Sequence, residues 1–350
     1  MTWVDPDEIG AWADIDLDGT IKSPSRLSFS SVSQYAECGE LWRLTRGFKR
    51  PSNSWYANPG GSTIHDMTQL YDEGKAEYAT LDEIKQDFAE IFEGHKAEYE
   101  GVELLPSGDK KLNELSWRGG PNGKDEKWWL HYGPLMVEAY IVWRKEQSSS
   151  FKIISIEHPF EQVIGGELVT GCIDRVEIHL PTGALFIRDV KSGDSGGYFQ
   201  LAGYREGFYR ETGMLADWGD LIKFRWEGEK VEVPLLDDEG NPVLYQRNGK
   251  GYKKGDPKMT TEDRGRVVCF TSRPTDFTGY TAEYVENVYE MARRGIEAGV
   301  FMPNSRNNCR YCGVNEYCRA YGGDKGLTFP VKSAIEPREK VSETPGGSQE

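Results

Sequence analysis

The chain has 350 residues, of which 37% are hydrophobic, and its 42 Lys and Arg against 57 Asp and Glu give a formal net charge of −15. This composition supports a packed core and excludes a wholly disordered chain. It contains no apolar run of about 18 residues that would span a membrane, and taken alone the charge argues against a nucleic-acid partner.

The acidic residues are concentrated in two stretches, so the net charge does not describe the whole surface. Residues 1–22 hold six acidic side chains and one lysine, and residues 72–138 hold sixteen acidic and eight basic side chains. Together they contribute −5 and −8, or −13 of the −15. The net charge therefore does not decide the class of partner. We expect residues 1–26 to form an acidic, flexible leader that lacks the basic start of a secretory signal.

The pattern of residues 27–150 predicts a mainly helical region. Apolar residues recur at helical spacing in four segments, and Ser62 is a suitable N-cap for the second. A loop rich in Pro, Gly and Asn over Pro51–Gly61 precedes that helix. The predicted helices cover Ser30–Leu44, Ser62 to about Gly74, 80–100 and 128–147.

After residue 150 the pattern changes to that of strands, which are rich in Ile, Val and Phe. Pro181-Thr182-Gly183 predicts a hairpin turn. We expect a core over residues 151–300 with an insertion near 213–266, a cysteine-bearing loop over 301–332 and a disordered tail over 333–350. The predicted strands are Phe151–Val163, Glu167–Leu180, Ala184–Lys191, Lys223–Val233, Val243–Tyr252 and Arg266–Thr271, with helices over Ser195–Thr212 and Thr275–Gly299. These elements predict an α/β fold with a mixed central sheet flanked by helices.

The hairpin places ionisable residues on the faces that otherwise carry core residues. Asp174 lies two residues before Val176, and Asp189 and Lys191 continue the face of Ile187. Ionisable side chains are rarely buried without a partner. This pattern therefore marks a candidate site.

Two registers of this hairpin remain open. If Leu180 pairs with Leu185, Asp174 lies opposite Lys191, whereas a slip by two residues places Asp174 opposite Asp189. In both cases two carboxylates and an ammonium meet, and the carboxylates repel unless a proton or cation separates them. Oxygen ligands favour Mg²⁺ or Mn²⁺, and Lys191 would then orient a water and stabilise charge on phosphorus. The alternative is a buried Asp–Lys ion pair.

Three motifs occur in a defined order: Gly171-Cys-Ile-Asp174-Arg, then Ile187-Arg-Asp189-Val-Lys191, then Gln200-Leu-Ala-Gly-Tyr204. In this order they resemble the RecB-like nucleases of the PD-(D/E)XK superfamily. The resemblance implies a restriction-endonuclease-like core in which Asp174 and Asp189 bind the metal, Lys191 serves catalysis, and Gln200 and Tyr204 act at the site and on the nucleic acid.

The same resemblance extends to a histidine upstream of the hairpin. Gly61-Ser-Thr-Ile-His65 matches the glycine followed by a metal-binding histidine at the start of a helix in that family. Glu157, on the strand before the hairpin, is a weaker candidate that would support the metal through water. Its alternative is an ordinary surface carboxylate.

The six cysteines divide into two groups. Cys172 and Cys269 lie in apolar strand-like runs and are expected to be small core residues. The remaining four are soft ligands at a spacing typical of a metal centre, either zinc or an iron–sulfur cluster; they are Cys38, Cys309, Cys312 and Cys318. Resemblance to nucleases of the AddB type and to CRISPR-associated exonucleases, which have one cysteine before the core and three after it, implies a [4Fe–4S] cluster.

Aromatic and basic side chains near Cys38 suggest a surface for a single strand. Trp42, Arg43 and Arg46 lie close together, and Lys49 and Arg50 follow. Aromatic rings stack on bases and basic residues contact phosphates. The alternative is a solvated amphipathic helix.

The resemblance implies a metal-dependent exonuclease that acts on DNA ends, in particular single-stranded ones, in recombination, repair or spacer acquisition. No Gly-x4-Gly-Lys-Ser/Thr motif of a helicase is present, so the chain would act alone, as an oligomer or with partner recombination proteins. We expect a cytoplasmic protein of a phage or mobile element, acting in the host cytoplasm and not at a membrane. The alternatives are an idle DNA-binding or adaptor module that keeps the fold, and an RNA nuclease.

Overall fold

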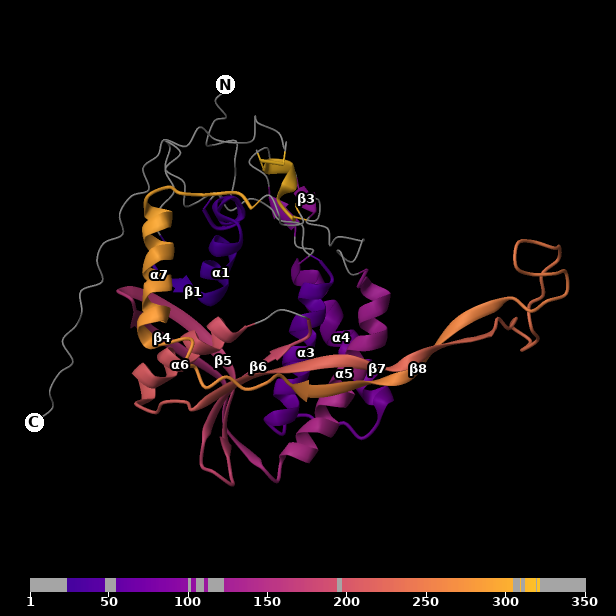
Figure 1. Cartoon of the computed structure of the whole chain (residues 1–350), viewed down its shortest axis with the longest axis horizontal. Helices are drawn as coiled ribbons and strands as arrows, with labels where there is room; N and C mark the ends of the chain where they lie inside the picture. Colours follow the sequence, from indigo (N-terminus) through magenta and orange to yellow (C-terminus); the bar gives the residue numbers. More distant parts are fainter. Residues whose placement is uncertain are drawn as a thin grey trace, which may run out of the picture.

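The structure is a computed structural model of the chain. It describes residues 24–47, 55–99, 102–104, 110–112, 123–193, 197–304, 309, 312–318 and 320–321. Most of the predicted leader, all of the tail, and Lys49 and Arg50 lie outside the described residues. The predicted α/β class is confirmed, since a mixed sheet lies between helices on both of its faces (Figure 1). The domain boundaries proposed from the sequence remain predictions.

The central sheet has six strands in the order β1-β5-β6-β7-β8, with β4 paired to β5. The pairs β1–β5 and β6–β7 are parallel, and the pairs β4–β5, β5–β6 and β7–β8 are antiparallel. Its strands are β1 (Leu27–Ser28), β4 (Phe151–Ile164), β5 (Glu167–His179), β6 (Leu185–Lys191), β7 (Trp218–Pro234) and β8 (Met259–Thr271). A separate two-stranded sheet pairs β2 (Val102–Leu104) with β3 (Lys110–Leu112).

Strand alternation directs two hydrophobic clusters to opposite faces of the sheet. Ile187 and Leu221 belong to one cluster, and Val190 and Ile222 belong to the other. The first face is covered by α1 (Phe29–Glu37), α2 (Gly39–Trp42), α6 (Tyr198–Thr212) and α7 (Ala282–Glu297). The second face is covered by α3 (Ala57–Asp72), α4 (Leu81–Tyr99) and α5 (Glu126–Gln147) (Figure 1).

The first two predicted helices differ from the structure at their boundaries. The first is interrupted at Cys38, whose extended backbone (φ −161°) separates α1 from α2. The second begins at Ala57 rather than Ser62, so part of the predicted loop is helical. Pro59 is tolerated there because the first turn of a helix needs no N–H from it. Gly60 is required by close packing, since a Cβ at this position would lie 2.2 Å from the Trp129 ring.

The predicted insertion forms a long arm. Strands β7 and β8 stay paired from Ile222–Thr271 to Pro234–Met259 and extend beyond the helical layers (Figure 1). The strand predicted over Val243–Tyr252 is not present, since this stretch carries only isolated bridges. Its glycines and charged residues provide no buried face for a strand to pack on.

None of the described helices combines the length and the hydrophobicity needed to cross a lipid bilayer.

Candidate active site

Strands β5 and β6 separate where the acidic residues meet. Their pairing runs from Ile178–Leu185 to Arg175–Arg188. One residue further in this register, Asp174 stands opposite Asp189, and Asp174 Oδ2 accepts a hydrogen bond from the Val190 backbone N–H at 2.7 Å. The Asp174 carboxylate thus accepts the Val190 N–H at the point where the backbone pairing of β5 and β6 has ended.

This register is the slipped one of the two considered above, so the pairing of Leu180 with Leu185 is wrong. The turn explains the difference. The His179 N–H donates to Ala184 O at 2.8 Å, and the Gly183 N–H donates to His179 O at 2.8 Å. The hairpin therefore closes at His179, which places Ile178 opposite Leu185.

Helix α3 brings His65 against the gap between the strands. Its neighbours Ile64 and Met67 are fully buried against the sheet. His65 Nδ1 lies 3.5 Å from Asp174 Oδ2, and Nε2 lies 2.9 Å from the Val190 carbonyl oxygen. Because a carbonyl oxygen can only accept, Nε2 carries the proton, which leaves the Nδ1 lone pair facing Asp174 when the ring is neutral.

Glu157 joins the pair from β4. Its neighbours Ile156 and His158 pair with Arg175 and Ile173, so Glu157 lies level with Asp174. Its backbone is left-handed, with φ 46°, which costs a non-glycine residue about 1–2 kcal/mol. Such conformations occur often at functional sites. One ligand atom from each of His65, Glu157 and Asp174 lies within 4.8 Å of the others.

Burial in an acidic site raises the pKa of Asp174 to about 7. Burial is the main cause, and the charges of Asp189 and Glu157 add to it, while His65 and the Val190 N–H act in the opposite direction. A buried group of negative charges is stabilised by a bound cation. Carboxylate oxygens with one imidazole are donors that suit Mg²⁺ or Mn²⁺, so the residues fit such an ion.

Lys191 is held by two neighbours at the end of β6. Its Nζ lies 2.6 Å from Asp189 Oδ2 and donates to Gln200 Oε1 at 3.0 Å. Gln200 Nε2 in turn donates to Asp189 Oδ1 at 3.1 Å and to the Tyr204 hydroxyl at 2.6 Å. The four residues form one connected group under the ammonium, with Gln200 and Tyr204 each only 9% exposed.

The carboxylates of Glu157 and Asp189 have different neighbours in the site. Glu157, the weakest candidate, lies with His65 and Asp174, whereas among the described residues Asp189 is not part of that close group of ligand atoms. Asp189 instead pairs with Lys191. Whether Asp189 also reaches the metal, as the sequence suggested, remains a prediction.

The comparisons with known proteins agree with this geometry. The family profile of the PD-(D/E)XK nuclease superfamily matches residues 26–319. The chain belongs to this superfamily. It is also similar to the Gene 69 protein of Mycobacterium phage D29, with 27% identity over 316 residues that cover 86% of this chain and 98% of the relative. The Gene 69 protein of Mycobacterium phage L5 is 26% identical over 324 residues, covering 84% of this chain and 96% of the relative.

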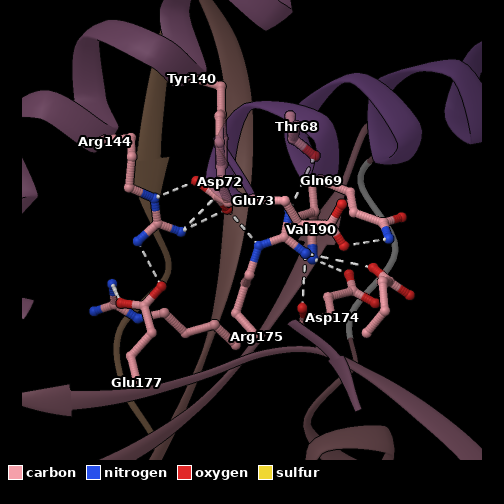
Figure 2. Close-up of polar contacts among 12 residues, drawn as sticks. Thr68, Gln69, Asp72, Glu73, Tyr140, Arg144, Asp174, Arg175, Glu177 and Val190 are labelled. Atoms are coloured by element: carbon pink, nitrogen blue, oxygen red, sulfur yellow. Dashed lines mark hydrogen bonds and ion pairs between the residues drawn. The ribbon is translucent and has the colours of Figure 1, made fainter. Parts of the chain in front are cut away.

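Behind this PD-(D/E)XK site lies a buried network of ion pairs that the sequence analysis missed (Figure 2). Arg175 follows Asp174 on β5 and points to the opposite face, where its Nε donates to Asp72 of α3. Its Nη1 donates to the Asp174 carbonyl oxygen at 2.7 Å and to Glu157 Oε1 at 3.4 Å. Arg175 thus links α3, β4 and β5 around the candidate ligands.

The network continues away from the site along the sheet. Arg144 of α5 donates to Glu177 Oε1 at 2.5 Å, and Arg188 Nη1 donates to Glu177 Oε2 at 2.9 Å. Arg188 also pairs with Asp220, whose pKa is raised to about 6 by burial. The only signal in the sequence was a run of charges at positions that strand alternation directs to the second face.

The four cysteines predicted to hold a cluster lie near one another, beside the first hydrophobic cluster. Cys312 and Cys318 pack against the first hydrophobic cluster, and the pKa of Cys312 is raised by burial and by the neighbouring Cys318, Cys38 and Cys309. The Asn304 N–H donates to Cys38 Sγ at 3.4 Å, and the Asn304 carbonyl oxygen accepts from Cys309 Sγ at 3.9 Å. The structure therefore brings together residues far apart in the sequence.

The other two cysteines have different environments. Cys269 is half-buried beside the second cluster. Cys172 is exposed, which contradicts its prediction as a core residue. Because β5 separates from its neighbour near Asp174, Cys172 lies at the edge of the site, where its thiol donates to Glu157 Oε2 at 3.4 Å.

Two of the predicted DNA-binding residues do not reach the surface. Trp42 and Arg43 are 2% and 1% exposed. Trp42 stacks on Phe301 and donates to Ser31 Oγ at 2.9 Å, and Arg43 forms a bidentate pair with Glu40. Their burial contradicts the prediction that they contact a strand, because the apolar face of this segment packs into the core.

Arg46 is the exposed member of that set. It donates to Gln34 Oε1 at 3.0 Å and to Ser30 Oγ at 3.2 Å. Its predicted contact with DNA remains a prediction.

Proposed function

We propose that this superfamily member is a metal-dependent exonuclease that digests single-stranded DNA from an end. The observation that carries the proposal is the close group of His65, Glu157 and Asp174 ligand atoms. This group lies beside an ammonium that is fixed by a further carboxylate and an amide. Hydrolysis of a phosphodiester needs positive charge where negative charge develops, and this arrangement supplies places for it.

His65, Asp174 and Glu157 would hold the ion, with Asp189 next to them. A bound Mg²⁺ or Mn²⁺ supplies charge to the phosphate and lowers the pKa of water. The protein prepares the ligands through a second set of contacts: the Val190 carbonyl fixes the tautomer of His65, and the Val190 N–H holds Asp174. Such contacts orient ligands before the ion binds.

Lys191 is assigned to stabilise charge on the phosphate and to orient the attacking water. An ammonium has three N–H donors, and Asp189 and Gln200 engage two of them. Among the described residues, these two partners leave the third donor for a phosphate oxygen. Gln200 and Tyr204 act as positioning residues, because Gln200 holds Asp189 and Lys191 and Tyr204 in turn holds Gln200, which reduces the reorganisation needed during the reaction.

The preference for a single-stranded DNA end rests on the resemblance to RecB-like nucleases. Similarity to two phage proteins supports an enzyme of a phage or mobile element. We place its substrate among the DNA ends that recombination, repair or spacer-acquisition-like processing produces, with partner recombination proteins or further copies of the chain.

We assign Cys38, Cys309, Cys312 and Cys318 to a [4Fe–4S] cluster. Four thiolates suit either one zinc ion or an iron–sulfur cluster, and the choice of the cluster rests on the resemblance to nucleases of the AddB type and to CRISPR-associated exonucleases. The approach of Cys38, Cys309 and Cys318 to Cys312 supports one shared metal centre. The cluster would tie residues near 38 to residues near 312.

The test of the nuclease is digestion of end-labelled single-stranded DNA with Mg²⁺ or Mn²⁺. We expect Lys191→Ala to lower kcat by at least about 10²-fold, as loss of one charge-stabilising group does elsewhere. Lys85→Ala is the matched control, since Lys85 lies exposed on α4 and pairs only with Asp82 among the described residues. Equal digestion by wild type and Lys191→Ala would refute the role of Lys191.

Labels on the 5′ and 3′ ends give the polarity in the same experiment. A circular single strand separates end-dependent from internal cleavage, and cutting of the circle at the rate of the linear strand would refute an exonuclease. An RNA strand of the same sequence tests the choice of sugar. Faster digestion of RNA than of DNA would refute a deoxyribonuclease.

A further inference from the structure

A recess of about 300 Å³ lies where β6 ends, on the face of the sheet opposite to Asp189. It is bounded by the first half of α5, by the residues that follow Lys191 and by the base of the β7–β8 arm. We infer that this recess holds one unstacked base of a single-stranded nucleic acid bound at the active site. The inference rests on the proposed nuclease function and adds a subsite that selects single strands.

Aromatic rings form its walls. Trp128 and Tyr132 of α5 have ring centroids 4.9 Å apart, and Tyr132 meets Trp226 of β7 edge to face at 5.8 Å. All three side chains are half-buried, in contrast to Trp129, which is 1% exposed and belongs to the core. Half-exposed aromatic faces are the surfaces on which bases of single strands stack.

The floor of the recess is apolar. Met136, Phe224 and Val267 line it and are part of, or pack against, the second hydrophobic cluster. A volume of about 300 Å³ is at the lower end of the range for small-molecule sites. This volume suits the flat ring system of one base and is too small for a double strand.

One basic side chain stands beside the rings. Lys124 Nζ lies 4.5 Å from the centroid of the Trp128 ring. Arg225 also borders the recess at the base of the arm, but its guanidinium lies 4.8 Å from the centroid of the Phe270 ring and donates to Glu227. In a protein with a net charge of −15, a basic group on an aromatic recess fits a ligand that combines phosphate with a base.

The recess lies next to the candidate catalytic residues. Ser192 and Gly193, which directly follow Lys191, are part of its lining. A Cβ on Gly61 of α3 would lie 3.2 Å from Ser192 Oγ, and Gly61 lies four residues before His65 on the helix, a rise of about 6 Å. A strand with a phosphate at Lys191 would pass around the end of β6 to place a neighbouring base in the recess on the opposite face. Paired bases remain inside the stack of a duplex and cannot enter without extrusion.

The test compares wild type with Trp226→Ala and Trp226→Phe on 5′-labelled oligothymidylate. We expect Trp226→Ala to raise KM about tenfold, which corresponds to the loss of one stacking contact. We expect kcat to stay within about twofold, since the ligands and Lys191 are untouched. Trp226→Phe keeps a ring in place and should restore most of the affinity. Trp218→Ala is the matched control, because Trp218 lies at the other end of β7 and is 37% exposed.

An oligonucleotide with one abasic nucleotide gives an independent readout. Wild type should pause when the missing base is due to enter the recess, and Trp226→Ala should not show that pause. An unchanged KM for Trp226→Ala would overturn the inference, and so would an equal rise in KM for Trp218→Ala. In both cases digestion by the wild type would leave the nuclease proposal intact. If the wild type digests nothing, the nuclease proposal fails. Binding of the labelled oligothymidylate, measured by fluorescence anisotropy, then tests the recess separately. Equal affinities of wild type and Trp226→Ala would overturn the inference that the recess holds a base.

Discussion

A register shift in β4 decides on which face of the sheet Glu157 lies. Regular alternation would place Glu157 on the face of Ile153, but the pairing with β5 shifts between Ile153 and Ser155, so Glu157 lies level with Asp174 and its carboxylate lies close to His65. Strand patterns predict direction only where the backbone is regular. This is why the weakest of the sequence candidates lies among the ligand atoms, while Asp174 and Lys191 were correctly expected to lie together near Asp189.

We predict that the metal-free protein loses stability as the pH rises from about 4 to about 7. The folded protein raises the pKa of Asp174 from its ordinary value of 3.8 to about 7. Between these values the folded state binds a proton that the unfolded state does not, so the free energy of unfolding falls as pH increases. Thermal unfolding in EDTA from pH 4 to 8 measures this slope. A melting temperature that rises across this range would contradict the prediction.

The variant Glu157→Gln tests the same residues in a second way. It removes one of the charges that raise the pKa of Asp174, so the loss of stability should end at a lower pH and be smaller. Metal binding should weaken because one oxygen ligand loses its charge. We expect the metal-free variant to be at least as stable as wild type at neutral pH but to digest DNA at least about 10²-fold more slowly. Glu161→Gln, an exposed change on the same strand, is the control.

At the scale of elements, α3 connects the site to the buried ion-pair network. One turn of this helix provides His65, and its last turn provides Asp72, which pairs with Arg175 and Arg144. The helices α4 and α5 and the strands β4, β5 and β6 lie within a few residues of their predicted bounds, because their apolar periodicity is regular. The start of α3 and the break at Cys38 were missed because packing against Trp129 and Phe301 overrides local preference there.

We predict that Arg175→Met lowers the free energy of unfolding by about 3–5 kcal/mol, since it leaves Asp72 buried without one of its counter-charges. Both side chains are fully buried. Arg294→Met removes an exposed pair with Glu290 on α7 and should cost less than about 1 kcal/mol. Urea unfolding of both variants gives the comparison. A similar small cost for the two changes would show that the buried network does not hold α3 to the sheet.

At the scale of the whole molecule, the two ends of the described chain meet on one face of the sheet. Tyr35 of α1 donates to the Val300 carbonyl oxygen at 2.6 Å, and the Gly39 N–H donates to Met302 O at 2.9 Å. Closing a loop of about 270 residues carries an entropic cost that grows slowly with its length. A cluster held by Cys38 and the three later cysteines would therefore fix α1 and α2 to the end of the chain.

We predict that Cys312→Ser abolishes the brown colour and visible absorbance of the anaerobically purified protein and lowers its melting temperature. One of four ligands is lost, and the link between the two ends is weakened. Cys172→Ser is the matched control, since Cys172 is exposed and outside the set of four, so its colour should match wild type. A colourless wild-type protein with bound zinc after anaerobic purification would refute the iron–sulfur assignment.

The sequence by itself determined the α/β class, most elements and the chemistry of the site, because residue type and local periodicity carry that information. Asp174, Asp189 and Lys191 were identifiable as ionisable groups on a core face. Only the tertiary structure decided the register of the hairpin, the approach of Glu157, the burial of Trp42 and Arg43, and the convergence of Cys38 with the later cysteines. Each of these depends on contacts between segments far apart in the chain, which local patterns do not encode.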